Sequence, residues 1–135
     1  MTLIEKAEHY ARYSHKDQKR RDGKTPYISH PEAVAQMVMN DDRVKAIAWL
    51  HDVLEDTEDT EQDLLASGFP SDVVDAVKVL TKTKDVPYEE YLKRIKKNDL
   101  ARSVKVADML HNLSDKPTEK QKERYTKGIQ FLCNG

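Results

Sequence analysis

Two adjacent pairs of polar side chains are the strongest chemical feature of this sequence. His51-Asp52 places an imidazole beside a carboxylate at the end of an apolar run, and Glu55-Asp56 adds two carboxylates one helical turn later. A neutral imidazole together with hard oxygen donors is a ligand set for a divalent transition metal. Carboxylates near such an ion can position a water molecule and take its proton. The pattern therefore predicts metal-dependent chemistry.

Two further residues lie at positions that suit a metal ligand. His30 precedes Pro31, so we expect it at a loop-to-helix junction, and Asp108 interrupts an otherwise apolar helical face. A buried, unpaired carboxylate is costly, so Asp108 needs a metal, a cation or a strong hydrogen-bond partner. We predict a metal site made of His30, His51, Asp52 and Asp108. This mixed nitrogen and oxygen set favours Mn²⁺ or Fe²⁺ over a structural zinc, for which thiolates are expected.

Each of these residues has a simpler explanation when it is taken alone. A lone helical histidine is more often packed or capping than a ligand, and Asp108 could pair with a buried arginine. Glu55-Asp56 could belong to the solvated acidic stretch 55–63. The combination in chain order, a histidine, then His-Asp, then an aspartate in an apolar helix, favours the metal site.

Helical elements must bring these residues together. Helical periodicity dominates, and no segment shows the sustained alternation of a strand. We expect a first helix over about 3–16, a second opened by Pro31, a third from Arg43 to about Leu54, and a short helix before Ser67. Four more follow, over about 71–80, from Pro87, over about 100–113, and after Pro117. The chain is predicted to be one all-α domain over residues 1–135.

Composition narrows the class of protein. At 135 residues the chain can bury one moderate core, and 38% hydrophobic against 35% charged residues suits a helical protein with solvated faces. A net charge of −1 gives no general attraction for nucleic acid or an anionic membrane, so any phosphate-binding surface must be local. The single Cys133 excludes an internal disulfide. Together with the absence of a signal-peptide pattern, this predicts a cytoplasmic protein.

Three segments together resemble the HD phosphohydrolase superfamily, and most closely the guanosine tetraphosphate hydrolase domains of the RelA/SpoT stringent-response enzymes and of small stand-alone alarmone hydrolases. The first covers 15–23 and 26–31, the second is His51-Asp52-Val53-Leu54-Glu55-Asp56-Thr57, and the third covers 105–113. The matches extend over most of the chain, from about residue 10 to 114. This resemblance implies a single HD-domain helical bundle.

The resemblance also implies roles for individual residues. His30, His51, Asp52 and Asp108 are expected to hold one Mn²⁺, while Glu55 and Asp56 orient and deprotonate the attacking water. Arg20 is expected to stack on the nucleobase, with Arg21 as its basic neighbour and Asn112 on the sugar or phosphate side. His111 is expected to support a ligand rather than to bind the metal. The residue types independently support one of these implied roles. Arg20, Arg21 and Lys24 form a local cationic patch that could bind a polyphosphate.

Three features bear on how closely the family pattern is followed. No histidine lies between Asp52 and His111, where dinuclear HD phosphodiesterases carry more, so one metal ion is expected. Asp115 stands three residues after Asn112, where we expect a hydroxyl residue. The loop around Gly23 has an extra residue, and the chain is shorter than the stand-alone relatives, mainly after Asn112.

The leading hypothesis is therefore an enzyme that uses Mn²⁺, or Fe²⁺, to remove the 3′-pyrophosphate of guanosine tetra- or pentaphosphate. The first alternative is an HD phosphatase that acts on another nucleotide, such as a deoxynucleoside monophosphate or NADPH. The second is a non-catalytic nucleotide-binding module. In each case the expected partner is a small nucleotide, with no nucleic acid and no membrane, and the sequence does not determine the oligomeric state.

Overall fold

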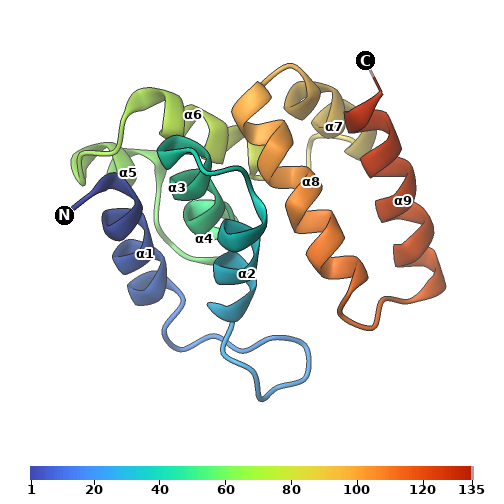
Figure 1. Cartoon of the computed structure of the whole chain (residues 1–135), viewed down its shortest axis with the longest axis horizontal. Helices are drawn as coiled ribbons and strands as arrows, with labels where there is room; N and C mark the ends of the chain where they lie inside the picture. The colour runs from blue at the N-terminus through green and yellow to red at the C-terminus, as the bar shows by residue number, and fades with distance from the viewer. Residues whose placement is uncertain (135) are drawn as a thin grey trace.

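The computed structural model describes residues 1–134, and within them the regular structure is helical (Figure 1). The helices are α1 (Leu3–Ser14), α2 (Ser29–Met37), α3 (Asp42–Leu50), α4 (Val53–Asp56), α5 (Glu61–Ala66), α6 (Ser71–Leu80), α7 (Tyr88–Lys96), α8 (Asp99–Leu113) and α9 (Glu119–Cys133). Extended pairing in these residues is limited to an isolated bridge between Lys19 and Pro26. The predicted all-α class is confirmed.

Helix starts follow the capping residues that the sequence offers. Asp41 precedes α3, and its side chain accepts hydrogen bonds from the backbone amides of Arg43 and Val44. Asn98 accepts in the same way from the amide of Ala101 at the start of α8. These side chains satisfy backbone donors that have no partner within the helix, which fixes where each helix begins.

Helix α3 forms the centre of the bundle. It packs against α1, α2, α6 and α8, and all of its residues from Ala46 to Leu50 are buried. A helix that is apolar around most of its circumference is stable only inside a core. Its C-terminal end, which leads directly into His51-Asp52, is therefore held rigidly from several sides.

Helix α8 connects the two parts of the molecule. It packs against α2, α3 and α6 on one side and against α7 and α9 on the other, and Figure 1 shows it running between these groups. Its buried residues include Val104, Ala107 and Met109, which lie in the core, and Asp108, which is one of the few buried charged residues. The long connection between α1 and α2 lies below the bundle in the same view.

The prediction of one helix from Arg43 to about Leu54 was wrong in one respect. Helix α3 ends at Leu50, and Asp52, with φ −104° and ψ 0°, separates it from the single turn of α4. These angles depart from helical values, so the chain changes direction at the two predicted ligands. One smaller difference concerns a helix start, since α2 begins two residues before Pro31.

Among the described residues, none of the helices has both the length and the apolar character that a bilayer-spanning segment requires.

Candidate metal and nucleotide site

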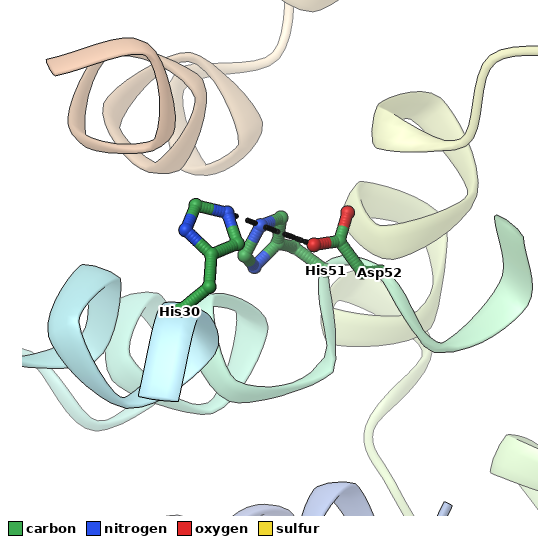
Figure 2. Close-up of side chains that lie close together, drawn as sticks. All are labelled: His30, His51 and Asp52. Carbon is green, nitrogen blue, oxygen red and sulfur yellow. Dashed lines mark ion pairs between the residues drawn. The ribbon is translucent and has the colours of Figure 1, made fainter. Parts of the chain in front are cut away.

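The side chains predicted to bind a metal come from separate helices and meet at one place. His30 lies in the first turn of α2, His51 follows the last residue of α3, and Asp52 precedes α4. One donor atom from each of these three lies within 4.8 Å of the others. Figure 2 shows the three side chains pointing toward one another across the gap between their helices.

Asp108 reaches the same place from α8. Its Oδ1 lies 2.7 Å from His30 Nε2 and 3.4 Å from His51 Nε2. Asp52 Oδ2 completes the group, at 3.1 Å from His51 Nε2 and 3.7 Å from His30 Nε2. The structure therefore brings all four predicted ligands together, with two imidazole nitrogens facing two carboxylate oxygens.

The orientation of His51 fits a metal ligand. Its Nδ1 lies 2.6 Å from the backbone carbonyl oxygen of Ala48, and because a carbonyl only accepts, Nδ1 carries the proton. The lone pair of the neutral ring is then on Nε2, which faces the carboxylates. Nε2 is buried and has no hydrogen-bond partner among the described residues. A buried acceptor without a donor is costly, and a cation at the centre of the group would satisfy it.

His30 is oriented in a similar way. Its Nδ1 lies 2.7 Å from Nδ1 of His111, so one of the two rings donates to the other, and Nε2 of His30 faces Asp108. Hydrogen bonding of the remote ring nitrogen is a common way to orient a metal-binding histidine. His111 therefore contacts the predicted ligand His30 through Nδ1, and its role as a support for that ligand stays a prediction.

Burial and charge act against each other in this cluster. Burial tends to lower the pKa of His51, but the carboxylates of Asp52 and Asp108 outweigh it and raise the pKa well above its ordinary value. Burial tends to raise the pKa of Asp108, but Lys105 and the two histidines hold it well below its ordinary value. The cluster therefore favours positive charge at its centre, from a proton or from a cation that competes with that proton.

Two residues that the sequence analysis did not assign hold the carboxylates in place. Lys105 Nζ lies 2.9 Å from Asp108 Oδ2, and the hydroxyl of Tyr27 donates to Asp52 Oδ2 over 2.6 Å. Lys105 precedes Asp108 by three residues in one helix, a spacing that puts both on one face, so its role could have been read from the sequence. The contact of Tyr27 depends on the loop conformation, and no local pattern indicates it.

The cluster forms part of the wall of a cavity of about 710 Å³. The cavity is lined by four acidic residues, Asp52, Glu55, Asp56 and Asp108, by six basic residues, Lys19, Arg20, Arg21, Lys82, Lys105 and Arg124, and by His30, Tyr27, Tyr88, Tyr91, Tyr125, Asn112 and Gln121. The basic residues come from the α1–α2 connection, the α6–α7 connection and helices α8 and α9. A chain with almost no net charge thus concentrates cationic side chains around one acidic centre.

Glu55 and Asp56 lie on the single turn of α4, beside the cluster. Oε1 of Glu55 accepts a hydrogen bond from the backbone amide of Lys82 over 2.8 Å, which fixes one carboxylate oxygen against the α6–α7 connection. Partial burial in the cavity wall, and the nearby charge of Asp52, raise the pKa of both carboxyl groups. A raised pKa makes each carboxylate a better proton acceptor.

The backbone of α4 is held by a second contact. Nδ1 of the buried His15 lies 2.9 Å from Oε1 of Gln18, and Nε2 of Gln18 donates to the backbone carbonyl of Asp56 over 2.8 Å. Because the amide oxygen of Gln18 accepts from the imidazole, its nitrogen is directed at Asp56. This contact attaches the α1–α2 connection to the turn that carries the two carboxylates.

The predicted substrate-binding residues separate into two groups. Arg20, Arg21 and Asn112 line the cavity, and the side-chain amide of Asn112 also donates to Asp108 Oδ1 over 3.3 Å. Lys24 is exposed at the tip of the α1–α2 connection and is not among the lining residues. The role of Lys24 in binding stays a prediction that this geometry does not support directly.

Comparisons with known proteins agree with this arrangement. A family model described as HD domain matches residues 7–129. Guanosine-3′,5′-bis(diphosphate) 3′-pyrophosphohydrolase MESH1 of Xenopus tropicalis is 38% identical over 125 residues, covering 84% of this chain and 69% of that protein. MESH1 of Homo sapiens is 37% identical over 125 residues, covering 84% of this chain and 68% of that protein.

Two further similarities extend the comparison. The GTP pyrophosphokinase rsh of Brucella melitensis is 35% identical over 125 residues, which cover 82% of this chain but only 16% of that protein. A solved structure, described as a metazoan orthologue of SpoT that hydrolyses ppGpp, superposes with a TM-score of 0.83 and 26% sequence identity, covering 100% of this chain and 87% of that one. By the extent of the family match and the identity with MESH1 proteins, this chain belongs to the HD domain family, in the group of hydrolases that includes MESH1.

Proposed function

We propose that this protein hydrolyses the 3′-pyrophosphate of guanosine tetra- or pentaphosphate, releasing pyrophosphate and GDP or GTP, with one Mn²⁺ bound. The observation that carries the proposal is the convergence of His30, His51, Asp52 and Asp108 beside a cavity that is lined by three of them and by Glu55 and Asp56. The names of the related MESH1 proteins supply the substrate.

The donor set supports a hard or borderline divalent cation. Two imidazole nitrogens and two carboxylate oxygens suit Mn²⁺ or Fe²⁺, and the group contains no thiolate. When bound, such an ion polarises the phosphate oxygens and lowers the pKa of a coordinated water. His30, His51, Asp52 and Asp108 are the residues that would hold it, and Tyr27, His111 and Lys105 keep them oriented.

Glu55 and Asp56 are proposed to act on the attacking water. Water attacks the phosphorus atom that is bonded to the ribose 3′ oxygen, the bond between that phosphorus and the 3′ oxygen breaks, and pyrophosphate leaves. One of the two carboxylates accepts a proton from the water and passes that proton to the departing 3′ oxygen, which becomes a hydroxyl group. The raised pKa of both carboxyl groups suits this transfer.

The basic residues of the cavity are proposed to bind the rest of the nucleotide. Lys82 and Arg124 provide positive charge for the phosphates, and Arg20 provides a planar cation for the nucleobase. Asn112 is proposed to contact the sugar or phosphate side. On this proposal the ligand is a small nucleotide rather than a nucleic acid or a membrane surface, and the lone Cys133 fits a reducing cytoplasm.

Product analysis tests this function. The purified protein is incubated with guanosine tetraphosphate and MnCl₂, and the products are separated by anion exchange and identified by ³¹P NMR. We expect GDP and pyrophosphate in equal amounts, and we expect the isosteric Glu55→Gln variant to lose turnover by roughly a hundredfold or more. Release of orthophosphate instead would indicate an HD phosphatase with another nucleotide substrate. Binding without turnover would indicate the non-catalytic module.

A further inference from the structure

An ion pair joins the α1–α2 connection to the corner between α8 and α9. Arg20 Nη2 lies 2.6 Å from Asp115 Oδ2, and the side chain of Arg20 is only 12% exposed while that of Asp115 is 46% exposed. Hydrogen bonding to Arg20 lowers the pKa of Asp115, so the carboxylate stays ionised. Asp115 is the residue that stands where the sequence analysis expected a hydroxyl group.

Neighbouring contacts strengthen the same connection. Arg21 donates to the backbone carbonyl of Asp115 over 3.3 Å and to Oε1 of Gln121 over 3.2 Å. Gln121 belongs to the capping box that starts α9, so its position is already fixed. The corner between α8 and α9 thus holds Arg20 and Arg21, two of the three arginines of the cavity wall, by separate contacts.

The connection that carries Arg20 is also ordered within itself. The carboxylate of Asp22 accepts from the backbone amides of Lys24 and Thr25, and the amide of Arg20 donates to the carbonyl of Thr25 over 2.8 Å. This turn is compact, but its own hydrogen bonds do not set its distance from the metal cluster. Asp115 can fix the position of Arg20 within this connection, because it lies two residues after the end of α8, the helix that carries Asp108.

In the described part of the chain, Arg20 and Lys105 are the cavity cations that form ion pairs with carboxylates, and Arg20 is the one whose partner lies outside the predicted metal ligands. Within residues 1–134, Lys19, Lys82 and Arg124 have no carboxylate within ion-pair distance, whereas Arg20 is paired with Asp115. A guanidinium group whose charge is balanced by a neighbouring carboxylate attracts phosphate less strongly than one without such a partner. Held at one edge by a carboxylate, however, the guanidinium of Arg20 has a fixed orientation in the cavity wall, which is what stacking on a flat ring requires.

From this geometry we infer that Asp115 is a positioning residue for nucleobase recognition: it fixes Arg20 relative to Asp108, so that the guanidinium faces the base while the phosphates lie at the metal cluster. The inference rests on the proposed function, because it takes Arg20 to contact the nucleotide. Among the described residues, Asp115 forms no hydrogen bond or ion pair with the predicted metal ligands.

A double-mutant cycle tests the inference. Asp115→Ala, Arg20→Ala and the double variant are compared with the wild type in KM and kcat for guanosine tetraphosphate with Mn²⁺. We expect Asp115→Ala to raise KM by roughly three- to tenfold, with kcat within about twofold of the wild type. In the Arg20→Ala background, Asp115→Ala should change KM little further. The matched control is Glu119→Ala, which removes an exposed carboxylate from the same corner without any contact with Arg20, and it should leave both constants unchanged.

Hydrogen–deuterium exchange supplies a readout that does not need the substrate. In Asp115→Ala we expect faster exchange of the amides in residues 19–25 and unchanged exchange in α3, and Glu119→Ala should leave residues 19–25 as in the wild type. Unchanged exchange of residues 19–25 in Asp115→Ala overturns the inference, as does an equal rise of KM in the wild-type and Arg20→Ala backgrounds. If the wild type does not hydrolyse guanosine tetraphosphate, the proposed function fails, and the exchange measurement still decides whether Asp115 positions Arg20.

Discussion

His30 Nε2 and Asp108 Oδ1 lie 2.7 Å apart, although 78 positions of sequence separate the two residues. The contact exists because α2 and α8 both pack against α3, whose C-terminal end delivers His51 and Asp52 to the same point. The candidate metal site is therefore a product of the packing of α2, α3 and α8. We expect substitutions near this site to fall into three groups: those that alter its charge, those that alter the orientation of the predicted ligands, and those that alter the neighbouring carboxylates proposed to be catalytic.

Lys105→Met should destabilise the protein chiefly when no divalent metal is added. The substitution leaves the carboxylate of Asp108 buried without its lysine, and breaking a buried ion pair costs roughly 3–5 kcal/mol of the free energy of unfolding. Added Mn²⁺ should recover part of this loss, because a cation bound by Asp108 compensates the charge and binding favours the folded state. Urea unfolding with EDTA and with MnCl₂ measures both quantities.

The control for Lys105→Met is Lys127→Met. Lys127 forms an ion pair with Glu123 in which both side chains are largely exposed, so its loss should change the free energy of unfolding by no more than about 1 kcal/mol. Equal losses in the two variants, or no effect of Mn²⁺ on Lys105→Met, would contradict the role given to Lys105.

Tyr27→Phe should weaken metal binding while leaving the fold intact. The substitution removes only the hydroxyl that donates to Asp52 Oδ2, so this carboxylate loses the group that orients it. Loss of such an orienting partner typically weakens metal affinity by roughly ten- to a hundredfold. Isothermal titration with MnCl₂ gives the dissociation constant, and circular dichroism gives the helix content. An unchanged dissociation constant would show that Asp52 does not need Tyr27.

Gln18→Glu should lower turnover without removing the metal. A glutamate keeps the size of Gln18 and can still accept from His15, but it cannot donate to the backbone carbonyl of Asp56. The turn that carries Glu55 and Asp56 should then shift, and small displacements of a catalytic group can cost roughly a hundredfold in rate. We expect kcat to fall at least roughly tenfold, with Mn²⁺ content unchanged.

The exposed Asp17→Asn, one residue away, is the control for Gln18→Glu and should keep the wild-type kcat. If Gln18→Glu loses Mn²⁺ in parallel with turnover, its effect is on the metal cluster and not on the carboxylates of α4.

Much of the fold could be predicted because the capping residues and apolar patterns in the sequence agree with the observed packing of the helices. Asp41 and Asn98 are capping residues that the sequence places before apolar helical runs, and both cap the predicted helices. The break between α3 and α4 could not be predicted in the same way. The residues from Arg43 to Leu54 form one continuous helical pattern, and the change of direction at Asp52 depends on the surrounding helices rather than on a glycine or proline.

The candidate site likewise has a part that could be predicted from the sequence and a part that could not. The residue types and chain order of His30, His51, Asp52 and Asp108 predicted a shared metal site. The packing of α2, α3 and α8 brings these four side chains together. The support from Tyr27, and the pairing of Arg20 with Asp115, depend on the conformation of the α1–α2 connection and on a contact between segments 95 residues apart in the sequence. Local sequence patterns do not indicate contacts between distant segments, so neither of these two contacts was predicted.

Binding of one divalent cation by His30, Asp108 and the His51-Asp52 pair between α3 and α4 is tested most directly by Mn²⁺ binding to the wild type and to Asp108→Asn. Electron paramagnetic resonance of free Mn²⁺ during a titration gives both stoichiometry and affinity. We predict one Mn²⁺ per wild-type chain, an affinity at least roughly tenfold lower in Asp108→Asn, and wild-type binding in Glu55→Gln. A wild-type stoichiometry of zero or two, or an Asp108→Asn affinity equal to that of the wild type, would contradict it.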